Sequence, residues 1–142
     1  GETRYHSVSN GLAEIKVDEA LVAVHDGVRP FVSVKTIADT FVEAEKSGAA
    51  VPVIECVDSV REVDNVSKES FAKERAALRL VQTPQTFRLS ILRKAYSLPY
   101  TPFFTDDASV VEAVGEKIVL TSGNRENIKI TTSFDLKIAE VL

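Results

Sequence analysis

The sequence lacks several residue types, and each absence removes a class of structure or chemistry. Cys56 is the only cysteine among 142 residues, so neither an internal disulfide nor a cysteine-based zinc site can form. The two histidines, His6 and His25, are too few for a histidine-rich metal site. No apolar stretch approaches the roughly 20 residues of a membrane span, and the N-terminus has no signal-peptide pattern. We therefore expect a cytoplasmic protein with no membrane partner.

Methionine is absent altogether, so this chain does not begin at its own start codon. Its first residues, GETRYHSV, also have the character of an internal segment. We expect the chain to be part of a longer protein.

Several familiar functional signatures are missing as well. The sequence contains no nucleophile-elbow glycine pattern with a Ser/His/Asp arrangement, and neither a GxGxxG nor a Walker A motif. The net charge of −4 argues against a nucleic-acid partner, because contact with a phosphate backbone requires a basic face. A local basic pocket for a small phosphorylated ligand remains compatible with this charge.

Helical and strand-like segments alternate along a chain whose length suits one domain. ALVAV (20–24) is a continuous apolar run, typical of a strand covered on both faces. Ile37, Phe41 and Ala44 lie on one stripe of a predicted helix that ends at Gly48. The expected helices are 4–15, 33–46, 89–97, 106–114 and 133–142, and the expected strands are 20–24, 49–54, 78–81 and 117–123, with a short extended piece at 127–130. This alternation predicts an α/β fold with a mostly parallel sheet covered on both faces.

Three local details refine this prediction. Pro52 lacks a backbone N–H, which favours an edge position or a bulge for its strand. Thr83-Pro84-Gln85 reads as a turn. Ser133 is the expected N-cap of the last helix, with Asp135 in the first turn.

The segment from about 56 to 78 differs from the rest because it is polar and only weakly periodic. Its Asp64-Asn65 pair is a turn signal. The residues alone are compatible with a projecting hairpin or arm, and they favour a solvated surface excursion.

Polar residues gather after three predicted strands, where ligands bind in open α/β sheets. Asp26 ends the ALVAV strand, and Gly27 beside it would let backbone approach a ligand closely. A carboxylate there could hold Mg²⁺ on nucleotide phosphates, or it could form an internal turn pair with Arg29. Thr83 follows another strand, and Lys129 lies after a third. Convergence of these turns would build a polar, phosphate-binding edge.

Five blocks in this order resemble the 2-C-methyl-D-erythritol 4-phosphate cytidylyltransferase family: GETR with HSV, VHDGVRPFV, VQTPQTF, FTDDASVVEAVG and GNRENIKITTSFDLKIAE. The resemblance covers residues 1–142 and implies a Rossmann-like three-layer nucleotidyltransferase fold with a projecting β-arm. It identifies the chain as the C-terminal part of a single domain, truncated before Gly1. The family's first strand and glycine-rich loop are then absent, and we expect this piece alone to be inactive.

The resemblance implies a reaction and a set of site residues. A sugar phosphate attacks the α-phosphorus of CTP and expels pyrophosphate in non-mevalonate isoprenoid biosynthesis, with Mg²⁺ at Asp26. Asp26, Arg75 and Lys129 are the implied catalytic residues. The implied CTP contacts are Gly1, Glu2, Ser7, Asp26 and Gly27, and the implied contacts of the sugar phosphate are Ser59, Arg75, Thr83, Thr105 and Lys129.

The resemblance also assigns the polar segment at about 56–78 to a dimerisation arm. Arg75 would enter the partner's site in a homodimer and hold the phosphate together with Lys129 of that partner. Two alternatives stay open. One is a ribitol 5-phosphate cytidylyltransferase, which shares several blocks, and the other is an inactive fragment that only binds substrate or dimerises.

Overall fold

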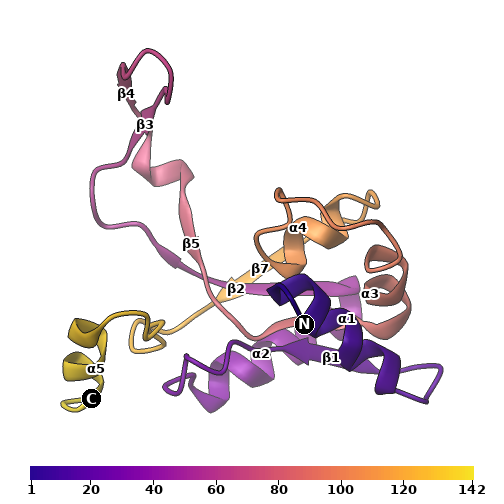
Figure 1. Ribbon diagram of the computed structural model, residues 1–142. Helices are drawn as coiled ribbons and strands as arrows, with labels where there is room; N and C mark the ends of the chain where they lie inside the picture. The colour runs from indigo at the N-terminus through magenta and orange to yellow at the C-terminus, as the bar shows by residue number, and fades with distance from the viewer.

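The apolar runs of the sequence form one five-stranded sheet in the computed structural model, which describes residues 1–142 (Figure 1). The sheet strands are β1 (Leu21–Val24), β2 (Ala49–Glu55), β5 (Arg79–Val81), β6 (Gln85–Arg88) and β7 (Val119–Ser122). The helices are α1 (Arg4–Glu14), α2 (Val34–Ser47), α3 (Leu89–Ala95), α4 (Asp107–Glu112), α5 (Ser133–Ala139) and the 3₁₀ helix η1 (Arg75–Ala77). The predicted α/β class is confirmed, and none of the helices combines the length and apolar character that crossing a membrane requires.

The sheet is mixed, although its core strands share one direction. Strands β1 and β2 both run antiparallel to β6, which lies between them, and β7 runs parallel to β2. The prediction of a mostly parallel sheet is therefore confirmed for β1, β2 and β7, which all run in the same direction. Strand β6 was not predicted, because QTFR is short and three of its four residues are polar. Its buried Gln85 and Thr86 are tolerated because their side chains hydrogen-bond to Asp106 and Thr40.

A bulge lies opposite Pro52, at the centre of the sheet. Between the pairs Val53↔Val81 and Ala50↔Thr86, residues 51 and 52 of β2 face residues 82 to 85. The prediction that Pro52 favours an edge was wrong, since β2 has neighbours on both sides. A bulge, which was the alternative expectation, is present. It lies in the segment between β5 and β6 that faces Pro52, where Gln82 N donates to Pro52 O at 2.9 Å. Thr83 lies in this bulge, next to the end of β1.

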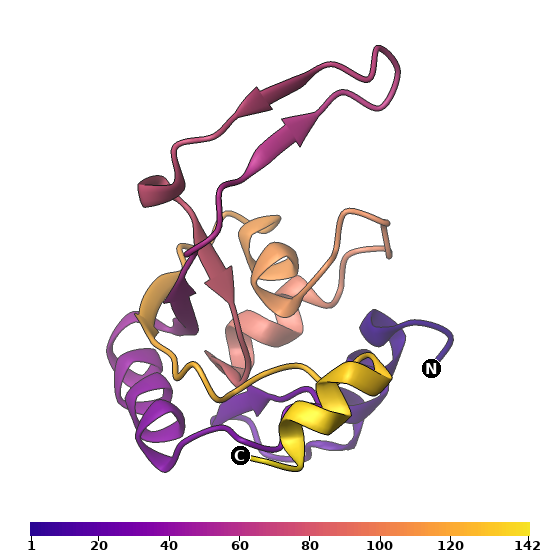
Figure 2. The same cartoon turned by 90° about the vertical axis from the view of Figure 1, so that its left-hand side faces the viewer.

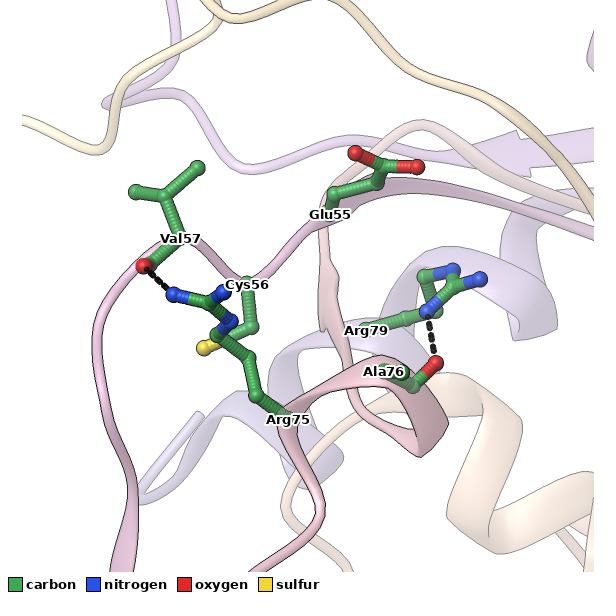
Figure 3. A pocket seen from close by; sticks show the side chains of 6 residues that line it. All are labelled: Glu55, Cys56, Val57, Arg75, Ala76 and Arg79. Carbon is green, nitrogen blue, oxygen red and sulfur yellow. Dashed lines mark hydrogen bonds between the residues drawn. The ribbon is translucent and has the colours of Figure 1, made fainter.

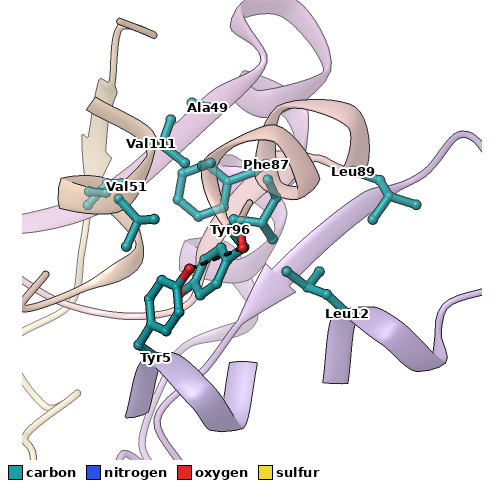
Figure 4. Close-up of a cluster of buried hydrophobic side chains, with 12 residues drawn as sticks. Tyr5, Leu12, Ala49, Val51, Phe87, Leu89, Tyr96 and Val111 are labelled. Atoms are coloured by element: carbon teal, nitrogen blue, oxygen red, sulfur yellow. Dashed lines mark hydrogen bonds between the residues drawn. The ribbon is translucent and has the colours of Figure 1, made fainter. Parts of the chain in front are cut away.

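Helices cover the sheet on both faces, which gives three layers (Figure 1). Helix α2 covers one face, where Thr40 accepts the buried hydrogen bond of Thr86. On the other face, Phe87 lies at the centre of an apolar cluster with side chains from α1, α3 and α4 (Figure 4). Burial of this cluster is the main source of stability for the body of the molecule, since apolar area removed from water contributes about 25 cal/mol per Å².

Helix boundaries follow the predicted caps with one correction. Ser33 caps α2, whose end is closed by Gly48 at φ 92°, and Asp106 caps α4. The N-cap of α5 is Thr132 rather than Ser133, because the Thr132 side chain accepts from Asp135 N while the Asp135 carboxylate accepts from Thr132 N. This reciprocal capping box places the N-cap one residue earlier than predicted, with Ser133 as the first helical residue.

The polar segment 56–78, here called the arm, projects from the body (Figure 1, Figure 2). Strands β3 (Arg61–Val63) and β4 (Ser70–Ala72) pair only with each other, and each of their residues is exposed. The turn between them is held by Asp64, whose carboxylate accepts from the N–H groups of Val66 and Ser67 at 2.8 Å. The possibility of a projecting hairpin is therefore confirmed.

Candidate functional site

Three turns from separate parts of the chain meet in one cavity of about 260 Å³, here called the Asp26 cavity. Asp26 follows β1, Thr83 lies in the bulge between β5 and β6, and Lys129 lies in the segment after β7. The ten lining residues are Arg4, Asp26, Arg29, Val81, Gln82, Thr83, Gln85, Thr105, Asp106 and Lys129. The expected convergence of the three polar turns is thus present in the structure.

Asp26 is surrounded by cations. Its Oδ1 lies 3.1 Å from Arg4 Nε, and its Oδ2 lies 3.2 Å from Lys129 Nζ and 3.5 Å from Arg29 Nε. Both alternatives raised for Asp26 are therefore compatible with the structure, because it forms the turn pair with Arg29 and also faces a cavity. Three cations and the two carboxylates of Asp26 and Asp106 line this cavity, so the lining has a net positive charge. Such a lining suits a phosphoryl group.

The charge of Asp26 is maintained by these neighbours. Burial of its carboxyl would raise the pKa, but Lys129 and Arg4 outweigh this effect and hold the pKa below its usual range. Asp26 is consequently ionised at neutral pH. The side chain of Lys129 is 45% exposed, against 11% for Asp26, which leaves the ammonium group accessible to an incoming anion.

Thr83 ties the bulge to the end of β1. Its hydroxyl accepts from the backbone N–H of Asp26 at 3.0 Å and lies 2.9 Å from Nδ1 of His25. The side chain is buried, so this geometry holds the Asp26 turn in place. The role of Thr83 as a substrate contact stays a prediction.

Buried amides connect the bulge to the segment that carries Lys129. Asn127 donates to Thr83 O at 2.8 Å, and Gln82 donates to Asn124 O at 2.9 Å. Arg29 also donates to the carbonyl of Asn127, at 2.8 Å. These bonds bring Lys129 to the same edge as Thr83 and Asp26, because each joins the segment after β7 to one of the other two turns.

Arg75 and Ser59 lie outside the Asp26 cavity, on the arm. Arg75 belongs to a separate cavity of about 540 Å³ at the base of the arm, shown in Figure 3. Its guanidinium donates to Val57 O, while Arg79 donates to Ala76 O (Figure 3). Ser59 is exposed in the irregular segment of the arm that leads from β2 to β3. Within one chain, the predicted phosphate-binding pair of Arg75 and Lys129 is therefore not assembled.

The predicted CTP contacts are only partly gathered near Asp26. Gly1 and Glu2 precede α1 and Ser7 lies in its first turns, and all three lie outside the cavity lining. Gly27 is exposed beside Asp26, with nothing within 4 Å of the position that a Cβ would take. A ligand could therefore approach the backbone there, as predicted for a glycine.

Asp26 could hold a divalent cation only together with ligands that come from outside the chain. The chain has no group of three or more carboxylate, histidine or cysteine side chains that could enclose a metal. Mg²⁺ is usually held by one or two carboxylates together with phosphate oxygens and water. The oxygen chemistry of Asp26 therefore fits an ion that is carried mainly by a phosphorylated ligand.

Sequence reasoning missed several residues of the Asp26 cavity. Arg4 belongs to the GETR motif, which gives it no role by itself, yet it bridges Asp26 and Asp107, with Nη2 2.7 Å from Asp107 Oδ2. Asp106 and Gln85 also line the cavity and are joined by a hydrogen bond of 2.8 Å. The long separations in sequence explain the omission, because no local pattern links Arg4 with residues 22 and 103 positions away.

Comparison with known proteins tests the family resemblance of the chain. A family model described as 2-C-methyl-D-erythritol 4-phosphate cytidylyltransferase matches residues 1–142. The proteins of that name from Phocaeicola vulgatus and Bacteroides fragilis are 56% and 54% identical over 142 residues, which is all of this chain and 64% of each relative. The chain thus spans a little under two thirds of the length of these relatives.

The fold comparison agrees with the sequence comparison. The crystal structure of 2-C-methyl-D-erythritol 4-phosphate cytidylyltransferase from Thermus thermophilus superimposes with a TM-score of 0.86 at 37% identity. That match covers 99% of this chain and 69% of the Thermus chain. The chain belongs to the 2-C-methyl-D-erythritol 4-phosphate cytidylyltransferase family.

Proposed function

We propose that the protein transfers a cytidylyl group from CTP to 2-C-methyl-D-erythritol 4-phosphate. A phosphate oxygen of the sugar phosphate forms a bond to the α-phosphorus of CTP, and the bond from that phosphorus to the oxygen bridging to the β-phosphate breaks. The products are 4-diphosphocytidyl-2-C-methyl-D-erythritol and pyrophosphate. The observation that carries the proposal is the Asp26 cavity, where three turns meet and where Arg4, Arg29 and Lys129 present cations to one space in a member of this family.

The cavity suits this reaction because phosphoryl and nucleotidyl transfer depends mainly on positioning and charge stabilisation. Lys129 is the mobile cation that receives the sugar phosphate, and Thr105 lines the same space as a polar contact. Asp26 keeps Lys129 at the cavity until the ligand enters, through the 3.2 Å ion pair. No covalent nucleophile is needed for these roles.

We further propose that Arg75 acts in the site of a second subunit in a homodimer. The arm extends away from the body (Figure 2), and its apolar side chains Val63, Val66 and Phe71 are 51%, 94% and 58% exposed. Exposed apolar groups on a projecting hairpin favour burial against a partner. An arm that clasps a second copy would carry Arg75 and Ser59 to a surface that they do not reach in their own chain.

Mg²⁺ belongs to this proposal as the ion that neutralises the triphosphate of CTP. Asp26 would hold it, together with oxygens of the nucleotide. The ion would stabilise the charge that develops on the leaving pyrophosphate. We place the reaction in the cytoplasm, in keeping with the unpaired thiol of Cys56.

A single assay tests the proposed reaction. The full-length protein is incubated with CTP and Mg²⁺ and is offered either 2-C-methyl-D-erythritol 4-phosphate or ribitol 5-phosphate, and pyrophosphate release is measured by a coupled enzyme. We expect release with methylerythritol phosphate at a rate far above that with ribitol phosphate. A preference for ribitol phosphate, or no release with either, would overturn the proposal.

A further inference from the structure

We propose that Arg4 is a further phosphoryl-binding cation of the Asp26 cavity and that Asp107, assisted by Tyr96, positions it. The inference rests on the proposed function, because it assigns residues to the site where a phosphorylated substrate enters. Arg4 begins α1, Asp107 begins α4, and Tyr96 follows the last residue of α3. Three helices are thereby joined to the end of β1 through one guanidinium group.

Arg4 has donors left for a ligand after its contacts within the chain. Its Nε donates to Asp26 Oδ1 at 3.1 Å and its Nη2 donates to Asp107 Oδ2 at 2.7 Å, so Nη1 is uncommitted. The guanidinium lines the cavity beside Lys129, and the side chain is 32% exposed. A planar guanidinium held at two of its nitrogens presents the third in a fixed direction, which suits recognition of a phosphoryl group.

Asp107 is placed to fix that direction. Its side chain is fully buried, and each carboxylate oxygen has one strong partner. Oδ2 accepts from Arg4, and Oδ1 accepts from the hydroxyl of Tyr96 at 2.6 Å. A buried carboxylate is unfavourable unless it is paired and hydrogen-bonded, so the native state strongly favours the arrangement in which Arg4 points at Asp107.

Tyr96 is itself held rigidly. Its ring stacks on Tyr5 with the centroids 4.7 Å apart, and the Tyr5 hydroxyl donates to the Tyr96 carbonyl at 3.0 Å. Burial raises the pKa of Tyr96, and the adjacent Asp107 charge raises it further, so the phenol remains a donor at neutral pH. Asp107 therefore has a fixed donor on one side, and its other oxygen stays directed at Arg4.

The test compares five variants of the full-length protein with the unchanged protein. Arg4→Gln removes the cation, Asp107→Asn removes the charge that positions it, and Tyr96→Phe removes one hydrogen bond of Asp107 while keeping the ring. The double variant Arg4→Gln/Asp107→Asn closes a thermodynamic cycle. The matched control is Glu116→Gln, which breaks the exposed Lys94–Glu116 pair outside the cavity.

Two kinds of measurement are made on each variant. Binding of inorganic phosphate is followed by calorimetry, and KM and kcat are determined with each substrate varied in turn. We expect Arg4→Gln and Asp107→Asn each to weaken phosphate binding about tenfold, the equivalent of about 1.4 kcal/mol. Tyr96→Phe should weaken it in the same direction, and Glu116→Gln should leave it unchanged. The substrate whose KM rises in Arg4→Gln then identifies whether the phosphoryl group belongs to the sugar phosphate or to CTP.

The cycle separates positioning from a purely structural role. If Asp107 acts through Arg4, the double variant should bind phosphate no more weakly than Arg4→Gln alone. Additive losses, or a lower melting temperature with unchanged phosphate binding in Tyr96→Phe and Asp107→Asn, would overturn the inference. Unchanged phosphate binding in Arg4→Gln would overturn it as well, even if the protein transfers cytidylyl groups. Failure of the proposed function is distinguishable, because the unchanged protein would then bind phosphate without releasing pyrophosphate from CTP.

Discussion

The Asp26 cavity and the arm place their charged residues in opposite surroundings. In the cavity, Asp26 has three cationic partners and its surroundings are fixed by buried amides and hydroxyls. On the arm, every residue of both strands is exposed, and its ion pair between Lys73 and Glu62 faces water. A site that must hold a phosphoryl group in place benefits from the first arrangement, whereas a segment that finds its partners in another chain is compatible with the second.

The largest expected contrast concerns stability. Phe87 is fully buried in the core and Phe71 is exposed on the arm. We expect Phe87→Ala to lower the free energy of unfolding by about 3–5 kcal/mol, because it leaves a cavity in the core. Phe71→Ala should change it by less than about 0.5 kcal/mol at concentrations where the protein is monomeric. Urea denaturation measures both, and similar effects of the two substitutions would remove the distinction.

The second contrast concerns ligand use. In the full-length protein, Lys129→Ala should weaken the use of methylerythritol phosphate by roughly 2 kcal/mol or more, since a charged contact to phosphate is lost. The KM for CTP should change far less. Steady-state kinetics with each substrate varied measures this difference, and Lys35→Ala on the exposed face of α2 is the control. If Lys129→Ala has the same kinetics as the control, Lys129 does not bind the sugar phosphate.

The third prediction joins the two regions. Arg75→Ala alone should also weaken the use of the sugar phosphate while sparing CTP. If Arg75 serves the partner's cavity, mixing Arg75→Ala with Lys129→Ala subunits should restore activity at a sugar phosphate concentration where each variant alone has almost none, because one site of each mixed dimer has both side chains. Random exchange in equal amounts predicts recovery to about a quarter of the unsubstituted activity. No recovery after confirmed subunit exchange would show that Arg75 does not act in the partner's site.

The smallest predicted effect is a pH dependence that the partly buried Asp26 of the cavity shares with a carboxylate elsewhere, Asp135 of α5. Burial would raise the pKa of Asp26, yet Lys129 and Arg4 lower it, and the hydrogen bond from Thr131 N lowers the pKa of the exposed Asp135 to about 2. A carboxyl group whose pKa is lower in the folded state stabilises the fold at pH values above its pKa in the unfolded chain, about 3.9. This stabilisation is lost as the pH falls through the pKa of the folded state.

The melting temperature should therefore decrease between about pH 4 and pH 2. Asp135→Asn should make this acid limb shallower, and Asp39→Asn on α2 is the control. An unchanged acid limb in Asp135→Asn would contradict the assignment of that pKa.

Much of the fold could be predicted from local sequence, whereas the hydrogen bonds and ion pairs that hold the site together could not. The stripe of Ile37, Phe41 and Ala44 and the closing Gly48 are local signals, and α2 lies where they indicate. Strand β6 was missed because its buried Gln85 and Thr86 are satisfied mainly by groups distant in sequence. The convergence of Asp26, Thr83 and Lys129 was predicted from the rule that strand ends share an edge.

The role of Arg4 illustrates the limit of that rule. Its two carboxylate partners come from the end of β1 and the start of α4, and only the packing of α1 against the core brings them together. The position of Arg75 is a second case, because the contact that we propose for it in another subunit would leave no signal within its own chain.

The most direct test of the account is a crystal structure of the full-length protein with 2-C-methyl-D-erythritol 4-phosphate bound. We predict that the phosphate lies in the Asp26 cavity within hydrogen-bond distance of Lys129, with Arg75 of a second subunit on its other side. A phosphate bound away from Asp26, Thr83 and Lys129 would contradict the account.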